Sequence, residues 1–197
     1  MRKINKINKI IPLILFITFG FLTISADFIK VAVVDMEYIL REYKITLVDI
    51  KRQFYIDEMT AKFEKIKAEI DSINQKLSNS NLTADERAKL EQAKQDKLNE
   101  AIKLRDYYKK LDEDLQQNRQ KYDMEDISFA IKKVCEKKGY ALALDSKMQG
   151  ILYYADYIDI SNNVLEYLFS MIVKFLKDNN VTNPEKYGID PNLYKQY

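Results

Sequence analysis

The chain has 197 residues, of which 47% are hydrophobic and 31% charged, so it can fold as one domain or at most two. It has no histidine and a single cysteine, which removes the usual general base, the commonest metal ligand and any intrachain disulfide. Only 4 glycines and 3 prolines are present, too few for the turns of a β-sandwich or a multi-turn α/β fold.

Residues 1–26 have the three-part layout of a secretory signal peptide. Basic residues come first, the apolar stretch IIPLILFITFGFLTI follows, and small residues then offer a cleavage site after Ala26. The alternative is an uncleaved anchor helix, but the apolar run is short for a membrane span of ~20 residues. Cleavage would remove 4 of the 32 basic residues and none of the 30 acids, leaving a net charge of −2. Such a balance does not indicate nucleic acid as a partner.

The chain after the signal peptide begins with a predicted strand and a long helix. FIKVAVVD (28–35) is rich in β-branched residues, as is typical of a buried strand, and Asp35 is suited to cap the next helix. Neither glycine nor proline occurs in 36–77, which predicts one continuous helix.

The apolar residues of this helix form a seam that changes phase. From 56 to 77 they recur in steps of three and four, as in a coiled coil. Leu47, Ile50 and Phe54 keep the same spacing in a different phase, so the five-residue step from Phe54 to Met59 marks a shift of the seam.

A second helix is predicted after the polar break SNSNL (78–82). Thr83 and Glu86 form the capping box that begins this helix, and no glycine follows before Gly139. Two long helices joined by a turn of about five residues must run antiparallel. We therefore predict a long antiparallel coiled-coil hairpin over 45–138, with its mixed charges in solvent.

The C-terminal part of the sequence predicts two more strands and a helix. YALALD (140–145) and GILYYAD (150–156) have the alternating or apolar character of short strands. The stretch 159–176 is amphipathic with a helical period. Residues 178–197 have no period and hold two of the three prolines, which predicts an extended or disordered tail.

The predicted fold is therefore mainly α with a small β part. Residues 27–177 form one domain, in which a body (27–44 and 139–177) carries the helical hairpin. Its three short strands would make a small sheet with open edges, which favours pairing with another chain. A closed barrel needs about eight strands or more, and three chains would supply nine. We expect the strand at 140–145 to pair with strands of other copies, and the sequence permits a β-barrel shared by three chains. The residues predicted at this interface are Val31, Val33, Leu142, Leu144 and Leu152.

This order of elements resembles the Skp/OmpH-like family of periplasmic chaperones. The resemblance covers roughly 28–170 and rests on VAVVDMEYIL, on the charged hairpin and on KGYALALDSKMQGILYYADYIDISNNVLEYL. Within the last stretch, the family's pattern at the start of its final helix is matched by Asp159, Ile160, Ser161, Val164 and Leu165.

The resemblance implies a homotrimer with a barrel body and helical tentacles that enclose a cavity. Such proteins hold unfolded outer-membrane proteins, called clients below, in the periplasm of Gram-negative bacteria without nucleotide. Some members of the family are strongly basic, whereas the mature chain is expected to be nearly neutral. The resemblance therefore does not imply that this chain captures clients by charge or binds lipopolysaccharide. Transient contact with a membrane surface is left open.

Client contact is then expected to rest on apolar and aromatic side chains. The candidates are Phe54, Tyr55, Tyr107 and Tyr108. No catalytic, cofactor-binding or metal-binding residues are predicted, because the sequence has no phosphate-binding glycine loop and no nucleophile motif. Cys135 is expected to be a small buried apolar residue. The alternative to a chaperone is a structural coiled-coil spacer of the cell envelope, tethered by an uncleaved N-terminal helix.

Overall fold

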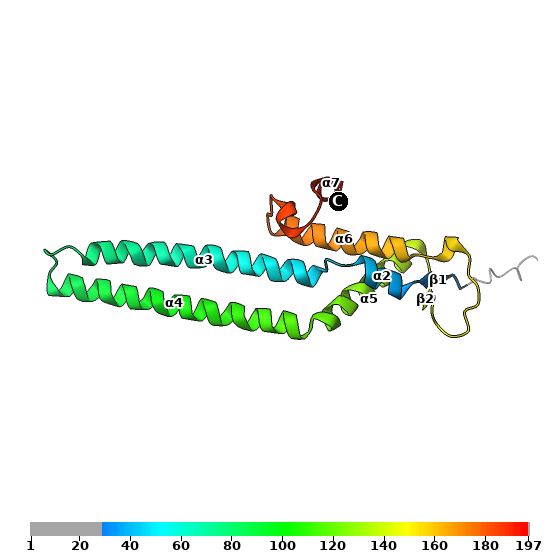
Figure 1. Ribbon diagram of the computed structural model, residues 1–197, viewed down its shortest axis with the longest axis horizontal. Helices are drawn as coiled ribbons and strands as arrows, with labels where there is room; N and C mark the ends of the chain where they lie inside the picture. The colour runs from blue at the N-terminus through cyan, green and yellow to red at the C-terminus, as the bar shows by residue number, and fades with distance from the viewer. Residues whose placement is uncertain (1–28, 197) are drawn as a thin grey trace, which may run out of the picture.

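The computed structural model describes residues 29–196 and shows an elongated, mostly helical molecule (Figure 1). A hairpin of two long helices occupies one end, and two short strands lie at the other. The helix over Ser161–Asp178 lies along the region between them. The predicted signal peptide, 1–26, lies outside the described residues.

The two strands pair within the chain. β1 (Val31–Val34) and β2 (Leu142–Asp145) form a parallel two-stranded sheet in which Val31 lies opposite Leu142. Within its own chain the strand at 140–145 has β1 as its partner, and its pairing with strands of other copies stays a prediction. β1 is buried from its second residue onward, which suits its β-branched composition.

The predicted strand over 151–155 is not formed, and this prediction was wrong. The segment has no strand partner and continues into a short 3₁₀ helix, η1 (Asp156–Ile158). The free edge of β1 is taken by the residues that follow η1, because the Ile160 N–H donates to the Val33 carbonyl at 2.9 Å. Residues 159–160, and not 151–155, therefore lie against this edge of β1.

The predicted helix over 36–77 is divided in two. α2 (Met36–Glu42) begins at Asp35, whose side chain accepts from the Tyr38 N–H as expected of a cap. α3 (Leu47–Leu77) begins at a second cap, Thr46, which forms a capping box with Asp49. This Thr-x-x-Asp signal starts a new helix without any glycine or proline, which is why the break was not predicted.

The return helix also has a break. α4 (Ala84–Gln117) begins at the predicted Thr83–Glu86 capping box, and α5 (Arg119–Lys138) ends at Gly139 in the left-handed conformation. Between them the chain bends at Asn118 (Figure 1). The Asn118 side-chain amide donates to the Asp114 carbonyl at 3.2 Å and to its carboxylate at 2.9 Å. Such local bonds compete with the helical pattern.

The core lies where α6 (Ser161–Asp178) packs against α2, α5 and the first turns of α3. Its apolar face is buried as the predicted amphipathic helix requires, with Val164, Leu168 and Ile172 fully covered. Cys135 belongs to this core, and burial raises the pKa of its thiol. The thiol is thus held in its neutral, unreactive form.

The last residues are folded, in contrast to the predicted extended or disordered tail. A 3₁₀ helix, η2 (Pro184–Tyr187), and a short helix, α7 (Pro191–Gln196), pack beyond the end of α6. Tyr187 and Ile189 are buried in the core cluster. Pro184 is buried as well, so apolar contacts help to order a segment whose overall composition is polar.

Phe54 links α3 to α6 and supports a stability prediction. Its ring makes an edge-to-face contact with Phe175, with centroids 5.5 Å apart. We expect Phe54→Ala to lower the free energy of unfolding by about 2 kcal/mol, because the packing of a half-buried ring is lost. Tyr153→Ala, which removes a ring that is 85% exposed, should change it by less than about 0.5 kcal/mol. Urea unfolding at matched protein concentration measures both, and equal effects would contradict the role given to Phe54.

Candidate functional site

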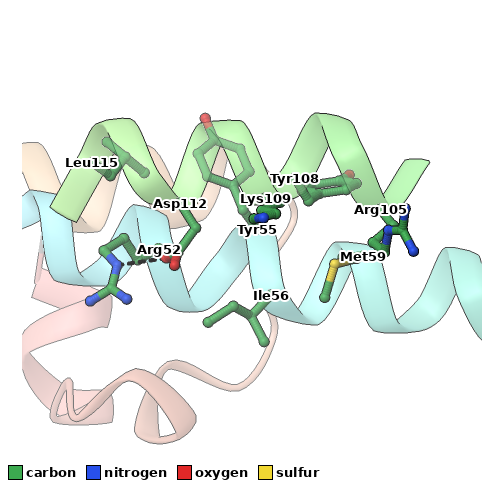
Figure 2. A pocket seen from close by; sticks show the side chains of 9 residues that line it. All are labelled: Arg52, Tyr55, Ile56, Met59, Arg105, Tyr108, Lys109, Asp112 and Leu115. Carbon is green, nitrogen blue, oxygen red and sulfur yellow. Dashed lines mark hydrogen bonds and ion pairs between the residues drawn. The ribbon is translucent and has the colours of Figure 1, made fainter. Parts of the chain in front are cut away.

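A groove of about 290 Å³ lies between α3 and α4 near the root of the hairpin (Figure 2). The side chains that α3 contributes are Arg52, Tyr55, Ile56 and Met59. Those that α4 contributes are Arg105, Tyr108, Lys109, Asp112 and Leu115. Each set recurs at helical spacing, so each occupies one face of its helix.

The groove lies at the seam shift of α3. Before the shift, Ile50 and Phe54 face the core and α6. After it, Ile66 is buried in the part of the hairpin where α3 has only α4 as a neighbour. Ile56 lies at the change of phase. Its side chain packs fully against neither α6 nor α4, and 41% of its surface stays exposed. The irregular spacing thus leaves apolar surface open between the helices.

Tyr108 forms the floor of the groove and is held by a polar network. It is only 5% exposed, and its hydroxyl accepts from the Lys62 ammonium at 3.0 Å. Lys62 also donates to the Glu58 carboxylate at 2.8 Å, and this bond holds the pKa of Glu58 below its usual range. Burial raises the pKa of Tyr108. At neutral pH the phenol is therefore protonated, and the floor of the groove is neutral.

The charged residues of the groove are paired with neighbours. Arg52 donates to Asp112 across the two helices at 2.8 Å, which fixes the helix spacing at one end of the groove. Arg105 donates to Asp106 at 2.9 Å, and Lys109 lies 3.7 Å from Glu113. The rim is therefore compensated, and the groove offers apolar and aromatic surface more than net charge.

This arrangement suits binding of apolar side chains. The groove contains no cysteine, serine or threonine that could act as a nucleophile. Within the part of the chain that the structure describes, no cluster of three or more Cys, Asp or Glu side chains could hold a metal ion. In 29–196, none of the helices combines the length and the apolar character needed to cross a membrane.

The structure separates the four predicted client-facing residues. Tyr55 and Tyr108 both line the groove, whereas Tyr107 is not among the lining residues and is 62% exposed beside Tyr108. Phe54 is directed to Phe175 of α6 and packs, partly buried, against the core, so it does not line the groove. Ile56 and Met59 line the groove as well, although their spacing predicts that they belong to the seam. The shift in the seam was the signal that could have found them.

The predicted barrel residues differ in how far their own chain covers them. Val33 is already buried in the body, and Val31 and Leu144 are partly covered. Leu142 is 47% exposed on β2, and Leu152 is 99% exposed in the loop before η1. Their place at an interface between copies stays a prediction.

Comparison with known protein families identifies the chain. The model of a family described as "Outer membrane protein (OmpH-like)" matches residues 30–168. The chain belongs to this family. The match includes the sheet, the whole hairpin and the first turns of α6, so it contains the groove. No curated protein matches the chain.

Membership of the OmpH-like family places the chain in a functional context. The family is periplasmic, occurs in Gram-negative bacteria and binds outer membrane proteins as a chaperone. The groove on the hairpin is thus the candidate binding site of an OmpH-like protein.

Proposed function

We propose that this protein is an ATP-independent holdase that binds unfolded outer-membrane proteins between the helical hairpins of a homotrimer. The observation that carries the proposal is the apolar groove between α3 and α4, with a neutral floor and a charge-compensated rim. Such a surface binds apolar segments without selecting a net charge, as a chaperone of many clients requires.

Exposed apolar side chains continue from the groove toward the tip of the hairpin. Ile102 precedes Arg105 by three residues on α4, and Leu98 precedes Ile102 by four, so all three share one face. The side chains of both Ile102 and Leu98 are exposed to solvent. Together with Ile56 they form a row along the hairpin on which an extended, unfolded segment can lie.

The direct test is whether the purified mature protein keeps a denatured β-barrel membrane protein soluble without ATP. We expect light scattering from the diluted client to be suppressed at about one trimer per client. Aggregation as fast as in buffer would overturn the holdase function and favour the envelope spacer. Mass spectrometry of the native protein distinguishes the holdase from the spacer as well. A tethered spacer would begin at Met1, whereas a cleaved chaperone would begin at Asp27.

Ile56→Ser is expected to weaken client binding about tenfold, because an isoleucine side chain covered by the client contributes roughly 1.5 kcal/mol. The matched control is Ile29→Ser, the same change at an exposed isoleucine two residues before β1, outside the hairpin. Titration of a fluorescently labelled client measures both affinities. An equal loss in the two variants, or no loss in Ile56→Ser, would show that the groove is not the binding surface.

A further inference from the structure

The C-terminal segment 179–196 lies beyond the part of the chain that the family model matches, which ends at residue 168. In Figure 1 it turns back at the end of α6 instead of extending away from the molecule. It touches α3 through one carboxylate. Asp57 accepts a hydrogen bond from the Tyr187 hydroxyl at 2.8 Å and pairs with the Lys186 ammonium at 2.7 Å.

The same segment also passes over the junction between α2 and α3. Gly188 lies so close to Ile45 that an added Cβ would be 3.0 Å from the end of the Ile45 side chain. Gly188 is in the left-handed conformation, which allows this close approach. Pro184, Tyr187 and Ile189 are buried on either side of it.

The segment is fastened to α6 at its other end. The Tyr194 hydroxyl donates to the Val181 carbonyl at 2.7 Å, and the Lys177 ammonium lies 5.3 Å from the centre of the Tyr194 ring. These contacts close 181–194 into a loop on the end of α6. The segment that contacts Asp57 is therefore held to the body at its far end and does not end in a free chain.

These contacts fall where the hairpin joins the body. The connection consists of two helix breaks, at 43–46 and at Asn118, and breaks in the helical hydrogen-bond pattern are points where helices bend. On the face of α3 turned away from α4, Ile50 belongs to the core cluster that includes α6, and Phe54 packs against this cluster. Asp57 is the next residue on this face, three positions after Phe54.

We propose that residues 179–196 act as a strap that fixes the root of the hairpin to the body and limits bending at the two helix breaks. The strap contacts α3 at Asp57, one turn after Phe54, which contacts α6. It also covers the α2–α3 junction. The orientation of the hairpin is then set by this chain's own C-terminal extension. The inference concerns the hairpin root alone and stands whether or not the groove binds clients.

Hydrogen exchange followed by mass spectrometry on the full mature chain tests the strap. In a variant that ends at Asn180, we expect the backbone amides of 47–58 to exchange on the order of tenfold faster, since a hydrogen-bonded charged contact is lost. Exchange in the centre of α6 should stay unchanged. Equal exchange of 47–58 in the truncated and the complete chain would overturn the proposal.

Point variants keep the test decisive if truncation disturbs the fold. Asp57→Asn should accelerate exchange in 47–58 several-fold, whereas Asp71→Asn, at an exposed carboxylate further along α3, should not. Exchanging the charges, with Asp57→Lys and Lys186→Asp in one chain, should restore most of the protection that either single change removes. No effect of Asp57→Asn, or an effect as large for Asp71→Asn, would show that the strap does not hold the hairpin.

Discussion

Leu142→Asp is expected to abolish the homotrimer while leaving the fold of each chain intact. Leu142 lies on β2, and its side chain is about half exposed within its own chain, so the substitution buries no charge there. Within the described residues, β2 pairs with β1 on one side only, which leaves its other edge open to a second copy. If that edge is the interface, an ionised carboxylate would be desolvated on assembly at a cost of several kcal/mol.

Sedimentation velocity measures the oligomeric state, and far-ultraviolet circular dichroism checks that the helices remain. Leu98→Asp is the control, because it places the same charge at an exposed leucine on the hairpin, away from the sheet. We expect Leu98→Asp to remain trimeric. A trimer that survives Leu142→Asp would place the interface elsewhere in the molecule.

Removing the distal half of the hairpin is expected to leave a folded trimer that cannot hold clients. The residues to delete are 66–100, replaced by a short Gly/Ser turn. The cut keeps the whole groove and the bond between Lys62 and Tyr108. It shortens the hairpin by roughly 20 Å, given the rise of an α-helix. The strap contacts and the core lie on the body side of the cut and should be unaffected.

This truncation separates two ways of holding a client. If an enclosed volume between long hairpins is needed, the shortened protein will fail to suppress aggregation of an unfolded outer-membrane protein, although it retains the groove. Light scattering at matched trimer concentration gives the result, and circular dichroism confirms the remaining helix. Protection equal to that of the complete protein would overturn the cavity mechanism and leave the groove as sufficient.

Local features of the molecule could be predicted from the sequence wherever neighbouring residues decide them. The capping box at Thr83 and Glu86 begins a helix because its hydrogen bonds span only three residues. Gly139 ends α5 for an equally local reason, since its left-handed conformation is strained for most other residues. The apolar spacing along α6 likewise predicted both the helix and its buried face. The ordered set of short motifs was enough to suggest the family.

Features that depend on a distant partner were decided only by the tertiary structure. The residues 151–155 have a strand-like composition, but they form no strand, and it is the Ile160 N–H that bonds to the free edge of β1. Phe54 has the spacing of a seam residue, yet it turns to Phe175 because α6 covers that face of α3. Asp57 is one of many charges on a helix surface until the chain returns 130 residues later to pair with it. Burial and pairing of this kind bring together residues far apart in the chain. The spacing of apolar residues along a helix shows which face is buried, but it does not show which distant element covers that face.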